Sequence, residues 1–231
     1  MNNKIEEIYE RIQNAKLKAG RTDKIFFTAV SKTRTVEELK EAEKISWIDF
    51  FGENKVQEAE NKRALYPESK LKWRLIGHLQ NNKARKAIEI FDFIDSVDSV
   101  ELALRLNRIA GELNKKISVL IEVNTSGEKS KTGINPENFS ELLDVAVNQE
   151  NLSLEGLMTV GPLTDDEKEI RKSFASLRKL LENSRIKTGL ALPVLSMGMS
   201  DDFELAISEG STMIRIGTLL FGPRDYSKIR D

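Results

Sequence analysis

The chain of 231 residues is long enough for one large domain or two small ones, and its 39% hydrophobic and 32% charged residues are typical of a soluble globular protein. Its 36 basic and 37 acidic side chains leave a net charge of −1, which gives no electrostatic reason to expect nucleic acid or an anionic membrane as a partner. The lack of cysteine excludes disulfides, a thiol nucleophile and a cysteine zinc site, and a single histidine excludes a multi-histidine metal site.

The first predicted element is an amphipathic helix that ends near Gly20. The N-terminal segment has no apolar signal core, and no stretch of the sequence approaches the length of a transmembrane helix. We therefore expect a cytoplasmic protein that does not bind a membrane. The helix is indicated by apolar residues at spacings of three and four, namely Ile5, Ile8, Ile12, Ala15 and Ala19.

Strand-like and helix-like segments alternate along the rest of the chain. Most strand-like runs are apolar on both faces, which is typical of parallel strands covered by helices. Amphipathic stripes between them predict helices, for example around 102–113 and 170–181. The eight runs lie near 25–31, 48–52, 72–77, 92–97, 117–124, 152–158, 192–197 and 212–217.

Three helix starts carry recognisable signals. Thr35 with Glu38 and Thr164 with Glu167 have the spacing of capping boxes. Pro136 follows Asn135 and suits the first position of a helix.

Eight strands that alternate with helices predict a single-domain α/β fold over residues 1–231, a (βα)8 TIM-like barrel with an extra N-terminal helix. The last strand is followed only by a short tail, 218–231, so the N-terminal helix is expected to take the place of the eighth helix. An open doubly wound sheet is the alternative that the same alternation permits. In a barrel, functional sites lie at the carboxyl ends of the strands, and phosphate often binds after strands seven and eight.

Lys32 ends the first strand-like run and shares a face with Phe26, Thr28 and Val30. Burial disfavours the charged form of a lysine, and a neutral lysine amine forms Schiff bases with aldehydes and ketones. The alternative is that Lys32 is the first solvated residue after the strand, because lysine is rarely buried.

Two glycine-containing turns suit a phosphate group. Gly198-Met199-Ser200 precedes a helix expected at Asp201, and Gly217-Thr218 follows the eighth strand. Glycine allows a close approach of the backbone, hydroxyls donate hydrogen bonds, and a helix N-terminus offers unpaired N–H groups. The alternative is a pair of ordinary turns in which serine caps a helix.

Arg215 is expected to point into the barrel because its neighbours Ile214 and Ile216 must face the helices. A buried arginine needs a partner, which is either a carboxylate such as Glu122 or Glu155 or an acceptor atom of a ligand. Lysine, arginine and two phosphate-type turns together suit pyridoxal 5′-phosphate (PLP). Its aldehyde would meet Lys32, its ring nitrogen would meet Arg215, and its phosphate would lie at the turns.

Other polar residues at strand ends carry weaker signals. His78 either stacks near a ligand ring or is an ordinary polar residue, and Asn54 is either a ligand contact or the N-cap of the next helix. Lys131 lies in a charged loop, where a solvated lysine is the usual case. Trp47 and Trp73 are expected to be packing residues.

At these residues the sequence resembles the pyridoxal phosphate homeostasis proteins, which are related to the N-terminal barrel domain of alanine racemase. The most specific segments are Gly77-His78-Leu79-Gln80 and Ser196-Met197-Gly198-Met199-Ser200, and Thr132 departs slightly, since the family often has serine there. The resemblance covers essentially the whole chain. The matching segments are 29–32, 51–58, 73–83, 155–159, 195–202 and 214–218.

The resemblance implies a barrel that carries PLP on Lys32, with Arg215 at the pyridine nitrogen. It also implies a non-catalytic carrier or buffer in vitamin B6, amino-acid and keto-acid balance, with PLP-dependent apo-enzymes as recipients, and Lys131 as an auxiliary lysine. A monomer is expected, because no long exposed apolar stripe is evident in the sequence. Phosphate would be held by Ser200, Gly217 and Thr218, and the remaining contacts would come from Ser196, Met197, Asn54 and His78.

Two enzymatic alternatives stay open, a PLP-dependent amino-acid racemase and a cofactor-free Schiff-base aldolase. An arginine at the ring nitrogen keeps that nitrogen unprotonated and weakens the electron sink on which PLP enzymes depend. A two-base racemase also needs a second acid or base, which alanine racemase takes from another domain of its partner subunit and for which this sequence offers no strong candidate. These points favour a carrier.

Overall fold

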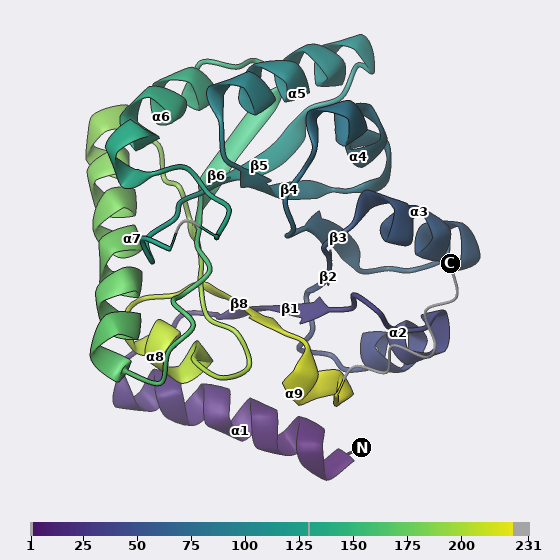
Figure 1. The fold of residues 1–231 in the computed structure, drawn as a ribbon. Coiled ribbons are helices and arrows are strands. Elements are labelled where there is room, and N and C mark those ends of the chain that lie inside the picture. The colour runs from purple at the N-terminus through teal and green to yellow at the C-terminus, as the bar shows by residue number, and fades with distance from the viewer. Residues whose placement is uncertain (1, 129, 224–231) are drawn as a thin grey trace.

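The computed structural model describes residues 2–128 and 130–223. Within them eight parallel strands close into a barrel in chain order, each paired with the next and β8 paired with β1 (Figure 1). The predicted barrel is confirmed, and the open doubly wound sheet is wrong. The strands are β1 (Phe26–Val30), β2 (Phe50–Glu53), β3 (Lys72–Leu75), β4 (Phe93–Val97), β5 (Ile117–Glu122), β6 (Leu152–Met158), β7 (Val194–Ser196) and β8 (Met213–Ile216).

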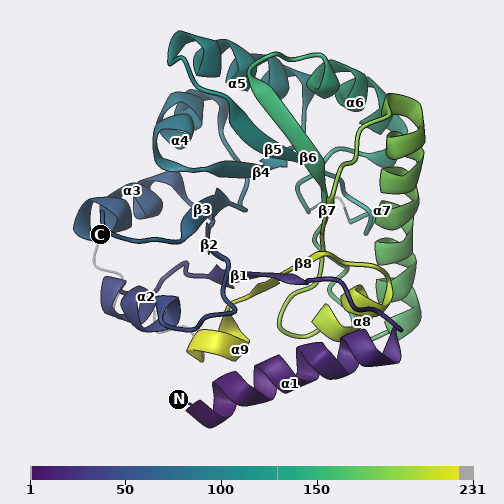
Figure 2. The ribbon, with the colours of Figure 1, turned by 180° about the vertical axis from the view of Figure 1, so that it is seen from behind.

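Helices surround the barrel on the outside, as the view from behind in Figure 2 also shows. The α-helices are α1 (Asn2–Lys18), α2 (Val36–Glu43), α3 (Val56–Leu65), α4 (Ala84–Ile90), α5 (Val100–Glu112), α6 (Phe139–Val147), α7 (Glu167–Thr188), α8 (Phe203–Ser208) and α9 (Thr218–Phe221). Two 3₁₀ turns, η1 (Asn81–Lys83) and η2 (Pro136–Asn138), precede α4 and α6. No helix in the described residues is long and apolar enough to cross a membrane.

The first helix covers the side of the barrel where the chain returns to its start. α1 lies along α8 and α9, next to β8 and β1 (Figures 1 and 2). It therefore takes the place of a long eighth helix, as expected. The short α9 begins the tail that follows β8, and residues 224–231 of that tail lie outside the described residues.

Alternation along the strands separates two apolar layers. Side chains such as Phe27, Phe51 and Trp73 point outward into the main core beneath the helices. A smaller cluster fills the inside of the barrel and consists of Phe26, Phe50, Leu120, Met158, Val194 and Met213. Ile214 and Ile216 point outward into the main core, so Arg215 between them points inward, as predicted.

Two of the three helix-start predictions are confirmed. Thr35 and Glu38 form a complete capping box at α2, and Pro136 opens η2, which leads directly into α6. The capping box of Thr164 and Glu167 is wrong. The side chain of Asp166 caps α7 instead, because it lies directly before the helix and accepts the N–H of Lys168 at 2.8 Å.

Both tryptophans are packing residues, as expected. Trp73 is fully buried and meets Phe51 edge to face at a centroid distance of 5.5 Å. Trp47 meets Phe27 in the same way at 4.8 Å.

Candidate functional site

A cavity of about 190 Å³ opens at the carboxyl ends of β1, β7 and β8. Three separate stretches of sequence, 30–34, 199–201 and 215–218, meet around it. Five of the residues expected to bind a ligand line this one cavity, namely Lys32, Ser200, Arg215, Gly217 and Thr218, together with Val30, Arg34, Met199 and Asp201.

Lys32 reaches the cavity from the turn that follows β1. The inward face of β1 carries Thr28, which is in register with Arg215 on β8, so the two strands bring lysine and arginine to the same wall. The next residue, Thr33, has a left-handed backbone with φ of +65°, which is uncommon for a β-branched residue. This turn directs the chain away from the barrel while Lys32 stays at its rim.

Arg215 is almost completely buried, with 3% of its surface exposed. Its guanidinium donates to Ser196 Oγ and to the carbonyl of Thr159, both at 2.8 Å. Burial lowers the pKa of this guanidinium, and the nearby carboxylates of Asp95, Asp202 and Glu122 act in the opposite direction.

The alternative of an ion pair between Arg215 and Glu122 or Glu155 is not found among the described residues. Glu122 accepts a hydrogen bond from Thr132 Oγ1 at 2.6 Å instead, and Glu155 is partly exposed. Because the acceptors of Arg215 are neutral oxygens, its charge is not neutralised by direct contact with a carboxylate. The remaining N–H groups suit an acceptor atom in the cavity.

The two glycine-containing turns lie side by side. Ser200 Oγ accepts the N–H of Leu219 in the first turn of α9 at 3.3 Å. A side chain at Gly198 would lie 2.6 Å from Ala206 Cβ, and the backbone there has φ of +97°, so the turn requires glycine. The helix expected at Asp201 begins two residues later, at Phe203.

Cationic groups predominate around the cavity. Lys32, Arg34 and Arg215 face it, against the single carboxylate of Asp201. Arg34 is also held by the end of α9 and the two residues after it, since its guanidinium donates to the carbonyls of Phe221 and of residues 222 and 223. The cavity therefore suits an anionic ligand.

The remaining expected contacts lie away from the cavity lining. Ser196 is fully buried behind Arg215, and Met197 belongs to the outer core beneath the helices. Asn54 packs against the backbone of residue 77, where an added Cβ would lie 2.5 Å from the Asn54 carbonyl. Asn54 is also not the N-cap of α3, because Lys55 holds that position without a side-chain hydrogen bond.

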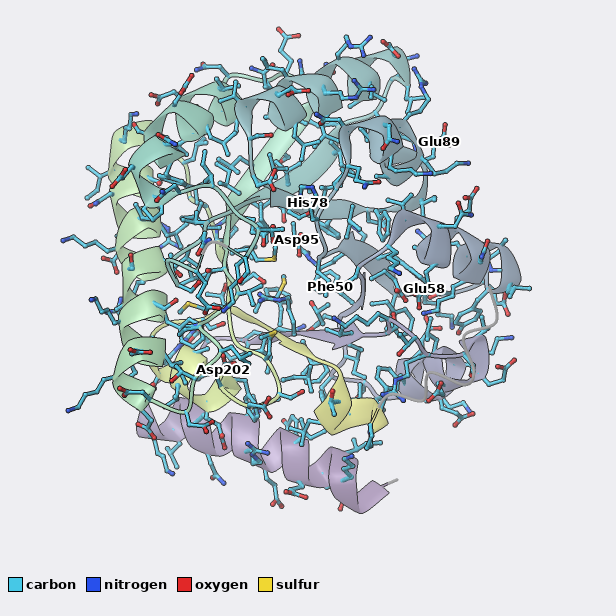
Figure 3. The ribbon with its side chains drawn as sticks, viewed as in Figure 1. Phe50, Glu58, His78, Glu89, Asp95 and Asp202 are labelled. Atoms are coloured by element: carbon cyan, nitrogen blue, oxygen red, sulfur yellow. The ribbon has the colours of Figure 1, made fainter. Side chains whose placement is uncertain are left out.

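His78 and Lys131 have protein partners of their own. His78 Nδ1 lies 3.0 Å from Asp98 Oδ2, and half of the His78 side chain is exposed near the middle of the barrel in the view of Figure 3. Lys131 Nζ pairs with Glu128 at 2.8 Å and also donates to the carbonyl of Gly161.

Two buried carboxyls lie near Arg215: Glu122, which was expected to face inward, and Asp202, which was not predicted from the sequence. Burial raises the pKa of Glu122 and of Asp202. Asp202 Oδ1 accepts the N–H of Met199 at 2.6 Å and so fixes the turn beside Ser200. Aspartate before a helix is common in sequences, so Asp202 carried no signal.

A second, larger cavity of about 970 Å³ lies on the other side of this turn, between α1, α7 and α8. It shares Met199 and Asp201 with the first cavity. Part of its charged lining is paired internally, as Arg11 with Glu204 at 2.8 Å and Arg171 with Glu167 at 3.8 Å. The smaller cavity brings together a lysine, two arginines and the hydroxyls of Ser200 and Thr218. It is therefore the candidate site.

Comparison with known proteins shows the family of this chain. The family model of the alanine racemase N-terminal domain matches residues 4–225. The pyridoxal phosphate homeostasis protein of Aquifex aeolicus is 39% identical over 224 residues, which cover 96% of this chain and 98% of that protein. The chain belongs to this family. Its relative of the same name in Pseudomonas aeruginosa is 41% identical over 223 residues, which cover 96% of this chain and 95% of that protein.

Several solved structures have a similar fold. PipY of Synechococcus elongatus, determined with PLP bound, is 39% identical with a TM-score of 0.81 and covers 92% of this chain and 99% of its own. A protein from Bifidobacterium adolescentis is 34% identical with a TM-score of 0.87, over 94% of this chain and 93% of its own. Alanine racemase of Clostridium difficile, 20% identical with a TM-score of 0.75, shares the fold over 98% of this chain and 58% of its own.

Proposed function

We propose that this chain binds PLP and holds it as a Schiff base on Lys32. In this proposal it is a non-catalytic protein that takes part in intracellular PLP homeostasis and in amino-acid and keto-acid balance. The observation that carries the proposal is the single cavity that Lys32, Arg215 and both glycine-containing turns line together. The family and the PLP-bound PipY structure support the same ligand.

The residues of the cavity fit the three functional groups of PLP. Ser200 and Thr218 supply hydroxyls, the backbone at Gly217 and Thr218 supplies N–H groups, and Arg34 adds a cation for the phosphate. Arg215, fixed by Ser196 and Thr159, would donate to the ring nitrogen. A volume of about 190 Å³ is below the usual range of roughly 300–1,000 Å³ for drug-sized ligands, as suits a small phosphorylated pyridine.

Lys32 provides the covalent attachment in this proposal. When bound, PLP supplies an aldehyde for Schiff-base formation and a pyridine ring that can act as an electron sink. The Lys32 nitrogen forms a bond to the aldehyde carbon, and water leaves with the carbonyl oxygen and two protons. Water reverses the link, which allows the ligand to be released unchanged.

The other expected contacts enter the proposal with different roles. Ser196 accepts a hydrogen bond from Arg215 and so holds its guanidinium in place. Met197 packs in the outer core directly after β7. Asn54 and His78 would approach the ring from the neighbouring strand ends, and Lys131 would assist the passage of PLP from its loop. We further propose a cytoplasmic monomer that passes PLP to apo-enzymes.

Arg215 supports a carrier more than a racemase, because an arginine does not protonate the ring nitrogen and leaves the electron sink weak. A direct test is to follow Cα deuterium exchange and racemisation over a panel of amino acids with wild type and Lys32→Ala. We expect no more than trace activity. A Lys32-dependent turnover within the usual enzyme range of about 1–1,000 per second would make this protein an enzyme.

Transfer is tested with an apo-enzyme and PLP-loaded protein while free PLP is trapped. Recovery of apo-enzyme activity faster than PLP release into the trap is the expected result. Recovery that only follows release would contradict a direct hand-over and leave a simple PLP buffer.

A further inference from the structure

A buried ionic cluster lies on the outer side of β1 and β2, behind the turn that carries Lys32. We call it the Lys62 cluster, and it consists of Lys62 and Glu58 on α3 and Glu53 at the end of β2. Lys62 Nζ lies 2.7 Å from Glu53 Oε1 and 2.7 Å from Glu58 Oε1. Lys62 is 7% exposed and Glu53 is fully buried, and Figure 3 shows Glu58 between α3 and α2.

The Lys62 cluster contacts both chain neighbours of Lys32. Ser31 Oγ donates to Glu53 Oε1 at 2.6 Å, and the Ser31 carbonyl accepts from Lys62 Nζ at 2.6 Å. On the other side, the N–H of Thr33 donates to Glu58 Oε1 at 2.5 Å. The peptide groups before and after Lys32 are therefore fixed by charged side chains of α3 and β2.

The backbone of this turn needs such support. Thr33 has φ of +65°, and a β-branched residue keeps a left-handed conformation only where the surroundings impose it. The hydrogen bond from Thr33 N–H to Glu58 supplies that constraint directly. Loss of the cluster would release the hydrogen bonds at Ser31 and Thr33. The turn could then relax and displace the side chain of Lys32, which lies between them.

Stability alone does not account for the Lys62 cluster. Removing charges from water is costly, and apolar replacements of buried ion pairs are often equally or more stable. One ammonium here faces two carboxyls, and desolvation raises the pKa of Glu53 to about 7 despite the attraction of Lys62.

We propose that Lys62, Glu53 and Glu58 are positioning residues that hold the turn 31–33 so that the Lys32 amine meets the aldehyde of a bound ligand. This inference rests on the proposed attachment of PLP to Lys32. It assigns to the polar face of α3 a role in the covalent step, while the phosphate turns after β7 and β8 supply binding. The two contributions are separable because the Lys62 cluster contacts only the turn after β1, whereas the phosphate turns after β7 and β8 line the cavity themselves.

The experiment compares two ligands on the full-length protein. PLP reports covalent attachment through the growth of Schiff-base absorbance, and pyridoxine 5′-phosphate, which lacks the aldehyde, reports non-covalent binding through its Kd. The variants are Lys62→Met, Glu58→Ala and Glu58→Gln. The matched controls are Lys86→Met and Glu60→Ala, whose side chains form an exposed ion pair between α4 and α3.

We expect Lys62→Met and Glu58→Ala to slow Schiff-base formation by about tenfold or more, since small misplacements of a reacting group are costly. The Kd for pyridoxine 5′-phosphate should stay close to that of wild type. Glu58→Gln keeps an oxygen that can accept from Thr33 and should recover most of the rate. Both controls should behave as wild type. Glu58 is partly exposed, so its variants test the proposal even where Lys62→Met does not fold.

Two outcomes would overturn the inference. Folded Lys62→Met and Glu58→Ala proteins with a wild-type rate would show that the cluster does not position Lys32, and equal losses for both ligands would show only general damage. A wild-type protein that forms no Schiff base on Lys32 would instead remove the proposed function itself.

Discussion

Arg74 and Arg215 both point into the barrel, but their surroundings differ. Those of Arg74 indicate a structural role, and those of Arg215 indicate a role in ligand binding. Arg74 forms a two-pronged ion pair with Asp95, at 2.7 and 2.9 Å, and its guanidinium lies over the rings of Phe93 and Phe50 at 4.0 and 4.8 Å. Among the described residues, the acceptors of Arg215 are neutral oxygens, and Arg215 lines a cavity. The charge of Arg74 is neutralised inside the protein, so this arginine serves the stability of the barrel. The charge of Arg215 has no carboxylate in direct contact among the described residues, so this arginine is suited to bind a ligand.

Breaking the internal ion pair should have the largest effect on stability. Arg74→Met leaves Asp95 buried without its partner, and the loss of one member of a buried pair costs about 3–5 kcal/mol of unfolding free energy. Urea denaturation measures this directly. The double variant Arg74→Met with Asp95→Leu should recover much of the loss, and a double variant as unstable as the single one would contradict this explanation.

A buried carboxyl outside the barrel adds a pH-dependent case to the comparison. Burial raises the folded pKa of Glu53 from 4.5 to about 7. Between these values the unfolded chain loses the proton while the folded protein keeps it, so stability should fall as pH rises from about 4.5 to about 7 and then stay level. The contribution is about 3 kcal/mol, at 1.36 kcal/mol per pKa unit.

The measurement is the unfolding free energy of wild type and Glu53→Gln at several pH values in this interval. The difference between the two proteins should decrease with rising pH, because glutamine does not titrate. A difference that is constant with pH would mean that Glu53 has an ordinary pKa in the folded protein.

Arg215→Met should affect the ligand more than the fold. The variant removes a charge that contacts no carboxylate in the described part of the chain, while Ser196 Oγ and the Thr159 carbonyl each lose one partner. We expect PLP affinity to fall by about 1.5–3 kcal/mol, the usual value of a charged hydrogen bond. Stability should fall less than in Arg74→Met. If Arg215→Met lowered the unfolding free energy more than Arg74→Met and left PLP affinity unchanged, the distinction between the two arginines would be wrong.

The smallest expected effect concerns the phosphate turns. Ser200→Ala should weaken PLP binding by about 1 kcal/mol, the loss of one hydroxyl hydrogen bond, while the backbone donors after β8 remain. Isothermal titration with PLP and with pyridoxal separates the phosphate contribution. Pyridoxal should bind far less tightly than PLP to wild type, and equal affinities would remove these turns from the site.

The fold could be predicted from the sequence because apolar runs and helical stripes report local environment directly. Arg215 stood out because alternation along the eighth strand requires an inward side chain there, and Lys32 stood out because it ends the first strand-like run of the sequence. Arg34 was missed because it follows the strand in a polar segment, where exposure is the usual case. The Lys62 cluster was missed because it joins residues 31–33 to residue 62, a contact that only the packing of α3 against β1 and β2 creates.

The central claim is that Lys32 carries PLP, and borohydride reduction tests it most directly. Reduction of the PLP-loaded protein fixes a Schiff base as a stable amine, and peptide mapping by mass spectrometry locates it. We expect the pyridoxyl group on the peptide that contains Lys32, and no trapped group at that position in Lys32→Ala. A pyridoxyl group found only on Lys131 or on an exposed lysine would contradict the account.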